Sequence, residues 1–314
     1  MRVRRVLRLR RTDARGLRAP LRGRAGARRR GSGVGAGAGG RALTVDLCGV
    51  QLRGPVLNGS GTYDAIAARR TFGDALLEPE SFPFDAFVSK TITLEPRQGN
   101  PPPRLWESPE GLINSIGLPN KGLEGFLRAD LPLLAELPVP LIVSVMGFSR
   151  DELAHLAAAV GEAAAVERVR AATEKPVIVK LTPTAADPAA VAAAAERSGA
   201  DAVSLVNTLK GMALDPRTRR PWLGGRTGGL SGPAIRPVAL EQVATVAARV
   251  RVPVIGMGGI ASGRDAREFL DAGAACVAVG TESFRDPSAG LRIAREFGVI
   301  SRQERGFSLA ETVR

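Results

Sequence analysis

The stretch "VPVIGMGGIASGRDAREFLDAGAACVAVGT", residues 252–281, decides the fold. It holds two short apolar runs, 252–259 and 275–281, and a segment of helical periodicity at 264–272 lies between them. Two parallel strands need a crossover connection, and a helix is the usual one. The stretch therefore predicts a βαβ unit in which glycine follows each strand.

The same alternation extends over most of the chain. Further apolar runs predict parallel strands at 55–60, 86–90, 141–147, 176–181 and 202–207, and helical segments are expected at 150–173, 188–198 and 233–250. The segment "LTVDLCGVQLRGPV", residues 43–56, predicts a hairpin where the chain enters the domain. Repeated β/α units of this kind indicate an α/β fold of the TIM (β/α)8 type. An open doubly wound sheet is the alternative, but its glycine fingerprint at the first strand–helix turn is missing.

The carboxyl ends of these runs are polar or glycine-rich, although a strand buried on both faces has no structural need of such an ending. A (β/α)8 barrel builds its active face from these ends, and it commonly binds phosphate after the last two strands. Two lysines at this rim suit an anionic ligand or a negatively charged flavin. The predicted rim residues are Ser60, Lys90, Lys180, Asn207, Gly258, Gly259, Gly280 and Thr281, with a further turn at Gly232 before Pro233.

Other residues have simpler interpretations. His155, the single histidine, is interpreted as a surface residue of a helix, and Trp222 lies in a long segment, 215–229, of a kind that often forms a lid. Cys48 and Cys276 are far apart, show no metal-binding spacing and are interpreted as reduced, packed residues of a cytoplasmic protein. No apolar run reaches the length of a membrane span.

The net charge of +13 lies in the first 41 residues, which hold fourteen arginines and one acid. The rest of the chain has 30 basic and 30 acidic residues. We expect residues 1–41 to be a disordered Arg/Gly-rich leader and residues 42–314 to form one barrel domain. The leader could also be a nucleic-acid-binding tail, a targeting peptide or translated sequence ahead of the natural start. The first two are disfavoured, so we expect neither nucleic acid nor membrane as a partner.

Six motifs together resemble a known family: "SKTITLEPRQGNPPPR" (89–104), "GLINSIGLPNKG" (111–122), "VIVKLTP" (177–183), "AVSLVNTLKGMALD" (202–215), "RTGGLSGPAIRPVAL" (226–240) and "VPVIGMGGI" (252–260). They are similar to the class 1 dihydroorotate dehydrogenases, above all to the NAD-linked class 1B branch. The resemblance covers about residues 43–290. It implies an FMN-containing barrel that oxidises dihydroorotate to orotate in pyrimidine biosynthesis, by loss of a proton from C5 and a hydride from C6. It also implies a homodimer core and a separate iron–sulfur flavoprotein subunit that reduces NAD.

The resemblance assigns roles by position. Residues that would hold FMN are Ser60, Lys90, Thr91, Lys180, Val206, Gly232, Gly258, Gly259, Gly280 and Thr281. Residues that would hold the substrate are Lys90, Asn114, Ser115, Ile116, Gly117, Leu118, Asn207 and Thr208. No metal site is expected.

We expect one βα unit to be missing, because only seven barrel strands can be recognised. Between the strands at 141–147 and 176–181 the family has helix, strand, active-site loop and helix, whereas this chain has one helix that ends in "VGEAAAVERVRAAT" (160–173). The absent part, roughly thirty residues or one βα unit, includes the loop that carries the family's catalytic cysteine base. We expect the sheet either to close with seven strands or to expose two edges.

Three functions follow as hypotheses. The first is a dihydroorotate dehydrogenase with impaired catalysis. The second is a related dihydropyrimidine dehydrogenase, which the segment "NSIGLPN" (114–120) disfavours. The third is a non-catalytic flavin-binding remnant or truncated product.

Overall fold

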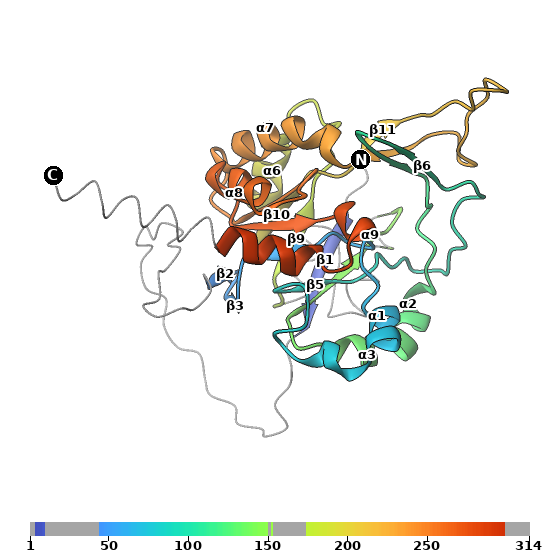
Figure 1. Cartoon of the computed structure of the whole chain (residues 1–314). Coiled ribbons are helices and arrows are strands. Elements are labelled where there is room, and N and C mark those ends of the chain that lie inside the picture. The colour runs from blue at the N-terminus through green and yellow to red at the C-terminus, as the bar shows by residue number, and fades with distance from the viewer. Residues whose placement is uncertain (1–3, 10–43, 150–151, 153–173, 299–314) are drawn as a thin grey trace, which may run out of the picture.

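The computed structural model describes residues 4–9, 44–149, 152 and 174–298. An eight-stranded sheet forms its centre, in the order β4-β14-β13-β10-β9-β1-β8-β5 (Figure 1). Seven of these strands are the ones predicted from the apolar runs: β4 (Val56–Asn58), β5 (Phe87–Val88), β8 (Leu141–Val145), β9 (Val177–Lys180), β10 (Ala202–Leu205), β13 (Val254–Met257) and β14 (Cys276–Val279). Five of them, β4, β14, β13, β10 and β9, pair in parallel as one continuous run.

The eighth strand comes from the expected leader. Arg4–Leu9 form β1, which lies between β8 and β9 and runs antiparallel to both. The expectation of disorder therefore does not hold for these residues, and the expectation that β8 and β9 would pair directly or stay unpaired is also wrong. Unpaired backbone groups on two neighbouring edges favour a third strand between them. Residues 10–41 lie outside the described part of the chain.

The strands alternate between two apolar clusters. In β8, β9 and β10, Val143, Val179 and Val203 pack with the helices, while Ile142, Ile178 and Ala202 join a second cluster with residues of the hairpin. The hairpin consists of β2 (Val45–Leu47) and β3 (Val50–Leu52), as the sequence predicted. Strands buried on both faces explain why the sequence shows continuous apolar runs rather than alternation.

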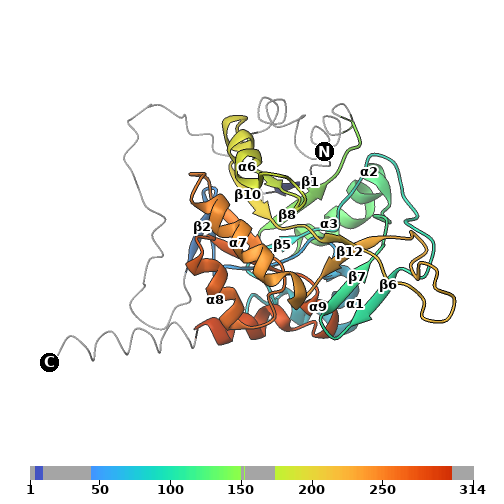
Figure 2. The same cartoon turned by 90° about the horizontal axis from the view of Figure 1, so that it is seen from above.

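The helices cover the outer side of the sheet (Figures 1 and 2). On one side lie α6 (Pro188–Arg197), α7 (Arg236–Ala247) and α8 (Gly263–Asp271), with a 3-10 turn at Pro233–Ile235 before α7. On the other lie α1 (Ala65–Phe72), α2 (Gly122–Gly125) and α3 (Leu131–Ala135), with short turns at Gly73–Leu77 and Phe126–Asp130. The short helix α9 (Glu282–Arg285) follows β14. Of the four predicted helices, three match these elements, and the fourth, 150–173, lies outside the described residues except for Glu152.

A second sheet stands apart from the first. It has four antiparallel strands in the order β11-β12-β7-β6, formed by Leu209–Gly211, Gly228–Ser231, Gly111–Asn114 and Leu105–Ser108. The sequence did not predict these strands, because they are short and, apart from β7, at most partly buried. Figure 2 shows β12, β7 and β6 beside the main sheet.

The two ends of the main sheet meet at Asn58. Leu57 of β4 and Ala86, next to β5, form a parallel bridge. The fully buried Asn58 side chain accepts a hydrogen bond from the Val88 N–H at 2.7 Å and donates one to the Val88 carbonyl at 2.9 Å. Its amide thus takes the place of a backbone partner between β4 and β5.

We expect Asn58→Leu to lower the free energy of unfolding by about 2–4 kcal/mol, because two buried backbone groups of Val88 lose their partner. Urea denaturation followed by circular dichroism measures this. Gln51→Leu is the matched control, since the exposed Gln51 amide contacts only the Asp46 carboxylate of its own hairpin. An equal loss in both variants would contradict the assigned role of Asn58.

Candidate functional site

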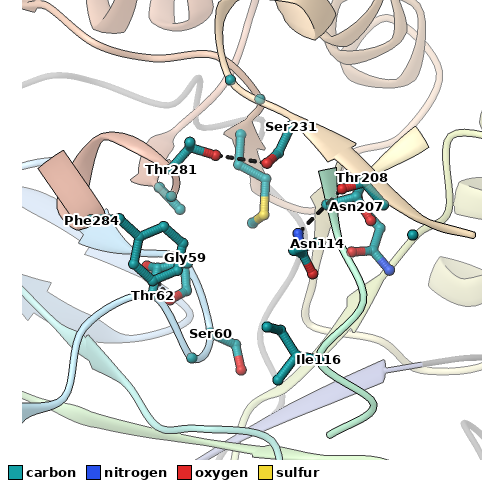
Figure 3. Close-up of a pocket in the computed structure, with 18 of the residues that line it drawn as sticks. Gly59, Ser60, Thr62, Asn114, Ile116, Asn207, Thr208, Ser231, Thr281 and Phe284 are labelled. Carbon is teal, nitrogen blue, oxygen red and sulfur yellow. Dashed lines mark hydrogen bonds between the residues drawn. The ribbon is translucent and has the colours of Figure 1, made fainter. Parts of the chain in front are cut away.

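A cavity of about 560 Å³ opens at the carboxyl ends of the parallel strands. The loops that follow β4, β5, β8, β10, β13 and β14 and the last residue of β9 form one part of its wall, and β7 and β12 of the small sheet form another. Its size is that of a cavity that takes a cofactor or a small ligand. Figure 3 shows Ser60, Asn114, Asn207 and Thr281 directed into this space from different elements.

Every residue that the sequence singled out for this site lines the cavity. The predicted phosphate residues are there, as are both lysines and the whole segment from Asn114 to Leu118, together with Ser60, Thr91, Val206, Asn207 and Thr208. The structure brings these residues together from distant parts of the chain. Their binding roles stay predictions.

Glycines form one end of the cavity. Gly258 and Gly259 follow β13 with φ angles of 137° and 76°, and Gly232 has a φ of 93°. A Cβ at Gly259 would lie 2.8 Å from the Arg236 Cβ and from the Gly232 carbonyl oxygen. Side chains are thus excluded here, and a ligand can approach the backbone N–H groups closely.

Two hydroxyls lie at this end as well. Thr281 donates a hydrogen bond to the Ser231 hydroxyl at 2.8 Å, as Figure 3 shows. Ser231 belongs to β12 and Thr281 follows β14, so the contact ties the small sheet to the main one. Sequence reasoning missed Ser231, because its strand carries no recognisable signal.

A buried carboxylate holds the glycine turn in place. Asp265 accepts a hydrogen bond from the Ala261 N–H at 2.9 Å and forms an ion pair with Arg236 of α7. Ser262 caps α8 by accepting from the Asp265 N–H at 3.2 Å. The sequence signal for this arrangement existed, since Ser262 followed three residues later by Asp265 resembles a capping box.

Hydroxyl groups connect the strands beneath the lysine side of the cavity. Thr91 lies 2.9 Å from Ser60 and 2.9 Å from Ser144, measured between side-chain oxygens. Lys90, next to Thr91, is exposed, and Lys180 at the end of β9 is half-buried. This side of the cavity therefore carries two cations from different strands, as the sequence predicted. Ser144 was missed because it lies inside the apolar run of β8.

The segment from Asn114 to Leu118 is held by the small sheet. Asn114 donates to the Gly229 carbonyl at 3.2 Å, and Ser115 donates to the Thr227 carbonyl at 2.9 Å. Asn100 donates to the Ser115 hydroxyl at 2.9 Å. Figure 3 shows Asn114 facing Asn207 and Thr208, which follow β10. The amide and hydroxyl groups of these residues can bind a ligand with both hydrogen-bond donors and acceptors.

The two cysteines do not line the cavity. Cys276 is fully buried within β14, and burial raises the pKa of its thiol far above the usual range. Cys48 lies in the turn between β2 and β3 and donates to the Asp201 carbonyl at 3.3 Å. Neither is placed to act on a ligand in the cavity.

Trp222 does not cover the cavity either. Its indole N–H donates to the Leu105 carbonyl at 3.3 Å, and the side chain rests against β6. Within the predicted lid segment, Gly228 and Gly229 line the cavity. His155 lies outside the described residues.

Among the described residues, no helix is long and apolar enough to cross a membrane. In the same part of the chain, no group of three or more His, Cys, Asp or Glu side chains could hold a metal ion.

Comparison with known proteins places the chain. The family model for dihydroorotate dehydrogenase matches residues 42–167 and 162–300. Dihydroorotate dehydrogenase B (NAD(+)) catalytic subunits from Pelobacter propionicus and Geobacter sp. strain M21 are each 43% identical to it, over 81% of this chain and 91% of theirs. A putative dihydroorotate dehydrogenase A (fumarate) from Solibacter usitatus is 40% identical, over 83% of this chain and 94% of its own. The chain therefore belongs to the dihydroorotate dehydrogenase family and is similar, within it, to the B-type catalytic subunits.

Proposed function

We propose that this protein binds FMN and dihydroorotate as the catalytic subunit of an NAD-linked dihydroorotate dehydrogenase, and that its turnover is impaired by the loss of one βα unit. The proposed binding of FMN and dihydroorotate is supported by one observation: the predicted FMN and substrate residues line the same cavity. We also propose that the bridge between Leu57 and Ala86 closes the main sheet as a TIM-type barrel.

The cavity fits FMN. Gly232, Gly258 and Gly259 form a cradle that any Cβ would fill, as a phosphate bound by backbone N–H groups requires. Lys180, half-buried at the far side of the same cavity, would face the electron-rich end of the flavin ring. When bound, FMN supplies the acceptor for the hydride from C6 of dihydroorotate.

The chain's own residues would bind and orient the substrate. Lys90 would attract the carboxylate of dihydroorotate, while Asn114 and Asn207 would bind its ring amides. Asn114 is fixed by its bond to Gly229, so little side-chain freedom is lost on binding. These contacts position C5 and C6, but they do not take up the proton from C5.

A base for that proton is missing from the described wall of the cavity. Its only carboxylate is that of Glu282, which forms an ion pair with Arg292 at 2.8 Å. No cysteine or histidine lines the described part. Both facts support the loss of the loop that carries the family's cysteine base.

The alignments support the loss of a whole unit. The alignment with the Pelobacter relative spans 284 positions but covers only 81% of this chain of 314 residues, which is about 254 residues. About 30 aligned positions therefore hold a residue in the relative and none here. The family model also matches in two pieces that overlap at residues 162–167, inside the segment where we infer the junction.

We further propose a cytoplasmic protein with a homodimeric core and an iron–sulfur flavoprotein partner that passes electrons to NAD. The relatives named as catalytic subunits support such a partner. A flavin-binding remnant without activity is the second candidate, and the missing base favours it.

Titration of the purified protein with FMN tests the binding half. We expect flavin fluorescence to be quenched until one FMN is bound per chain, and orotate to perturb the absorbance of the bound flavin. A folded protein that leaves FMN fluorescence unchanged would overturn the proposal.

Lys180→Met tests the assigned flavin orientation. Loss of a cation near the ring should lower the two-electron reduction potential of bound FMN by about 20–60 mV, because about 30 mV corresponds to 1.4 kcal/mol. Spectroelectrochemical titration measures this change. Lys210→Met is the control, since this exposed lysine of β11 does not line the cavity. An unchanged potential in Lys180→Met would place the ring elsewhere.

A further inference from the structure

The backbone of β1 is paired along both edges. On one side Arg5 to Leu9 pair with Val145 to Leu141 of β8, and on the other Arg4 to Leu7 pair with Lys180 to Val177 of β9. Arg5, Val6 and Leu7 therefore have a partner on each side. A segment in this position is a central strand of the sheet, whatever its composition suggests.

The space that β1 occupies is one strand wide. Strands in a sheet lie about 4.8 Å apart, so β8 and β9 are separated by roughly twice that distance. Both are fully or almost fully buried strands of the parallel set. Without a strand between them, each would present a row of unpaired N–H and C=O groups to the other.

The direction of β1 indicates that it is not part of the regular β/α repeat. Strands joined by helical crossovers run parallel, as β9, β10, β13 and β14 do. β1 is antiparallel to both neighbours, and it comes from before the first β/α unit in the chain. It therefore does not replace the absent unit by repeating it.

We propose that residues 4–9 are a surrogate strand, which fills the slot between β8 and β9 that the lost βα unit leaves open. The slot is thus occupied by a segment of this chain. Residues 4–9 of the Arg-rich leader are a structural element of the barrel. The surrogate restores the hydrogen bonds of the two edges. Being antiparallel, it starts at the rim where Lys180 lies, and so it brings no strand-to-helix loop there to replace the catalytic one.

Hydrogen–deuterium exchange of the full chain, read by mass spectrometry, tests this directly. We expect the amides of Arg5 to Leu7 to exchange at least roughly a hundredfold more slowly than the rates calculated for an unstructured peptide of the same sequence, because a central strand opens only with the sheet. Exchange at the unstructured rate would overturn the proposal. The inference rests on the proposed loss of the βα unit, but the measurement needs no FMN, so a protein that fails to bind flavin would leave it unaffected.

Proline substitution gives a second test. Val6→Pro removes a backbone donor and should lower the thermal midpoint and abolish the protection. Equal midpoints for Val6→Pro and the parent protein would contradict the proposal. If Val6→Pro does not fold at all, addition of a peptide of residues 1–12 should recover folded protein, and a peptide with the same substitution should not.

Discussion

Purified protein saturated with FMN is expected to oxidise dihydroorotate roughly 10²–10⁴ times more slowly than the Pelobacter catalytic subunit, which is the range that the loss of a general base spans. The reason is the wall of the cavity. Its described part holds lysines, amides and hydroxyls but no cysteine or histidine, and the one carboxylate in that part, Glu282, is paired with Arg292. An assay with dihydroorotate and an artificial electron acceptor measures turnover without a partner subunit.

Two controls separate a missing base from a damaged protein. Bound FMN reduced with dithionite should pass its electrons to the artificial acceptor at an ordinary rate, because that step needs no base. Insertion of the relative's additional segment at residues 162–167, where the two family matches overlap, should restore turnover by at least about tenfold. Turnover equal to that of the relative in the unmodified chain would show that some other group takes the proton.

Seven strands of the main sheet could be predicted from the sequence because they are buried on both faces. Before their polar ends at Lys180 and Asn207, the runs 176–181 and 202–207 contain no polar residue except Ser204, and the structure places β9 and β10 within them. The site could be predicted from the same apolar runs. A lysine or a glycine pair at the end of such a run lies at the edge of the sheet where the parallel strands end. A strand buried on both faces can therefore be recognised from its own continuous apolar sequence.

The remaining elements depend on partners that are distant in the chain. β1 consists of "RRVLRL", and its composition indicates a solvated segment. It becomes a strand through pairing with β8 and β9, more than a hundred residues away. The small sheet also depends on partners that are distant in the sequence, because β7 pairs with β12. Its strands show no clear alternation of apolar and polar residues. Local patterns do not encode such pairings.

Gly259→Ala is expected to weaken FMN binding by roughly 10–100-fold, since a charge-assisted hydrogen bond contributes about 1.5–3 kcal/mol and the turn must shift if it carries a side chain. At a φ of 76° the new Cβ would lie 2.8 Å from the Arg236 Cβ and from the Gly232 carbonyl. Neither atom is the free end of a flexible side chain. Asp265 pairs with Arg236 and accepts from the Ala261 N–H, so the turn is held on both sides and has little room to yield.

Gly49→Ala provides a control of the same backbone strain. Gly49 has a φ of 78°, and a Cβ there would meet nothing within 4 Å. Both variants should therefore lose about 1 kcal/mol of stability from the left-handed backbone. Only Gly259→Ala should lose FMN affinity, as measured by fluorescence titration. If both variants bind FMN as the parent protein does, the glycine cradle is not the phosphate site, and the flavin would have to lie elsewhere along the cavity. If both variants lose FMN affinity equally, the loss is caused by destabilisation of the fold and not by the Cβ that fills the space at Gly259.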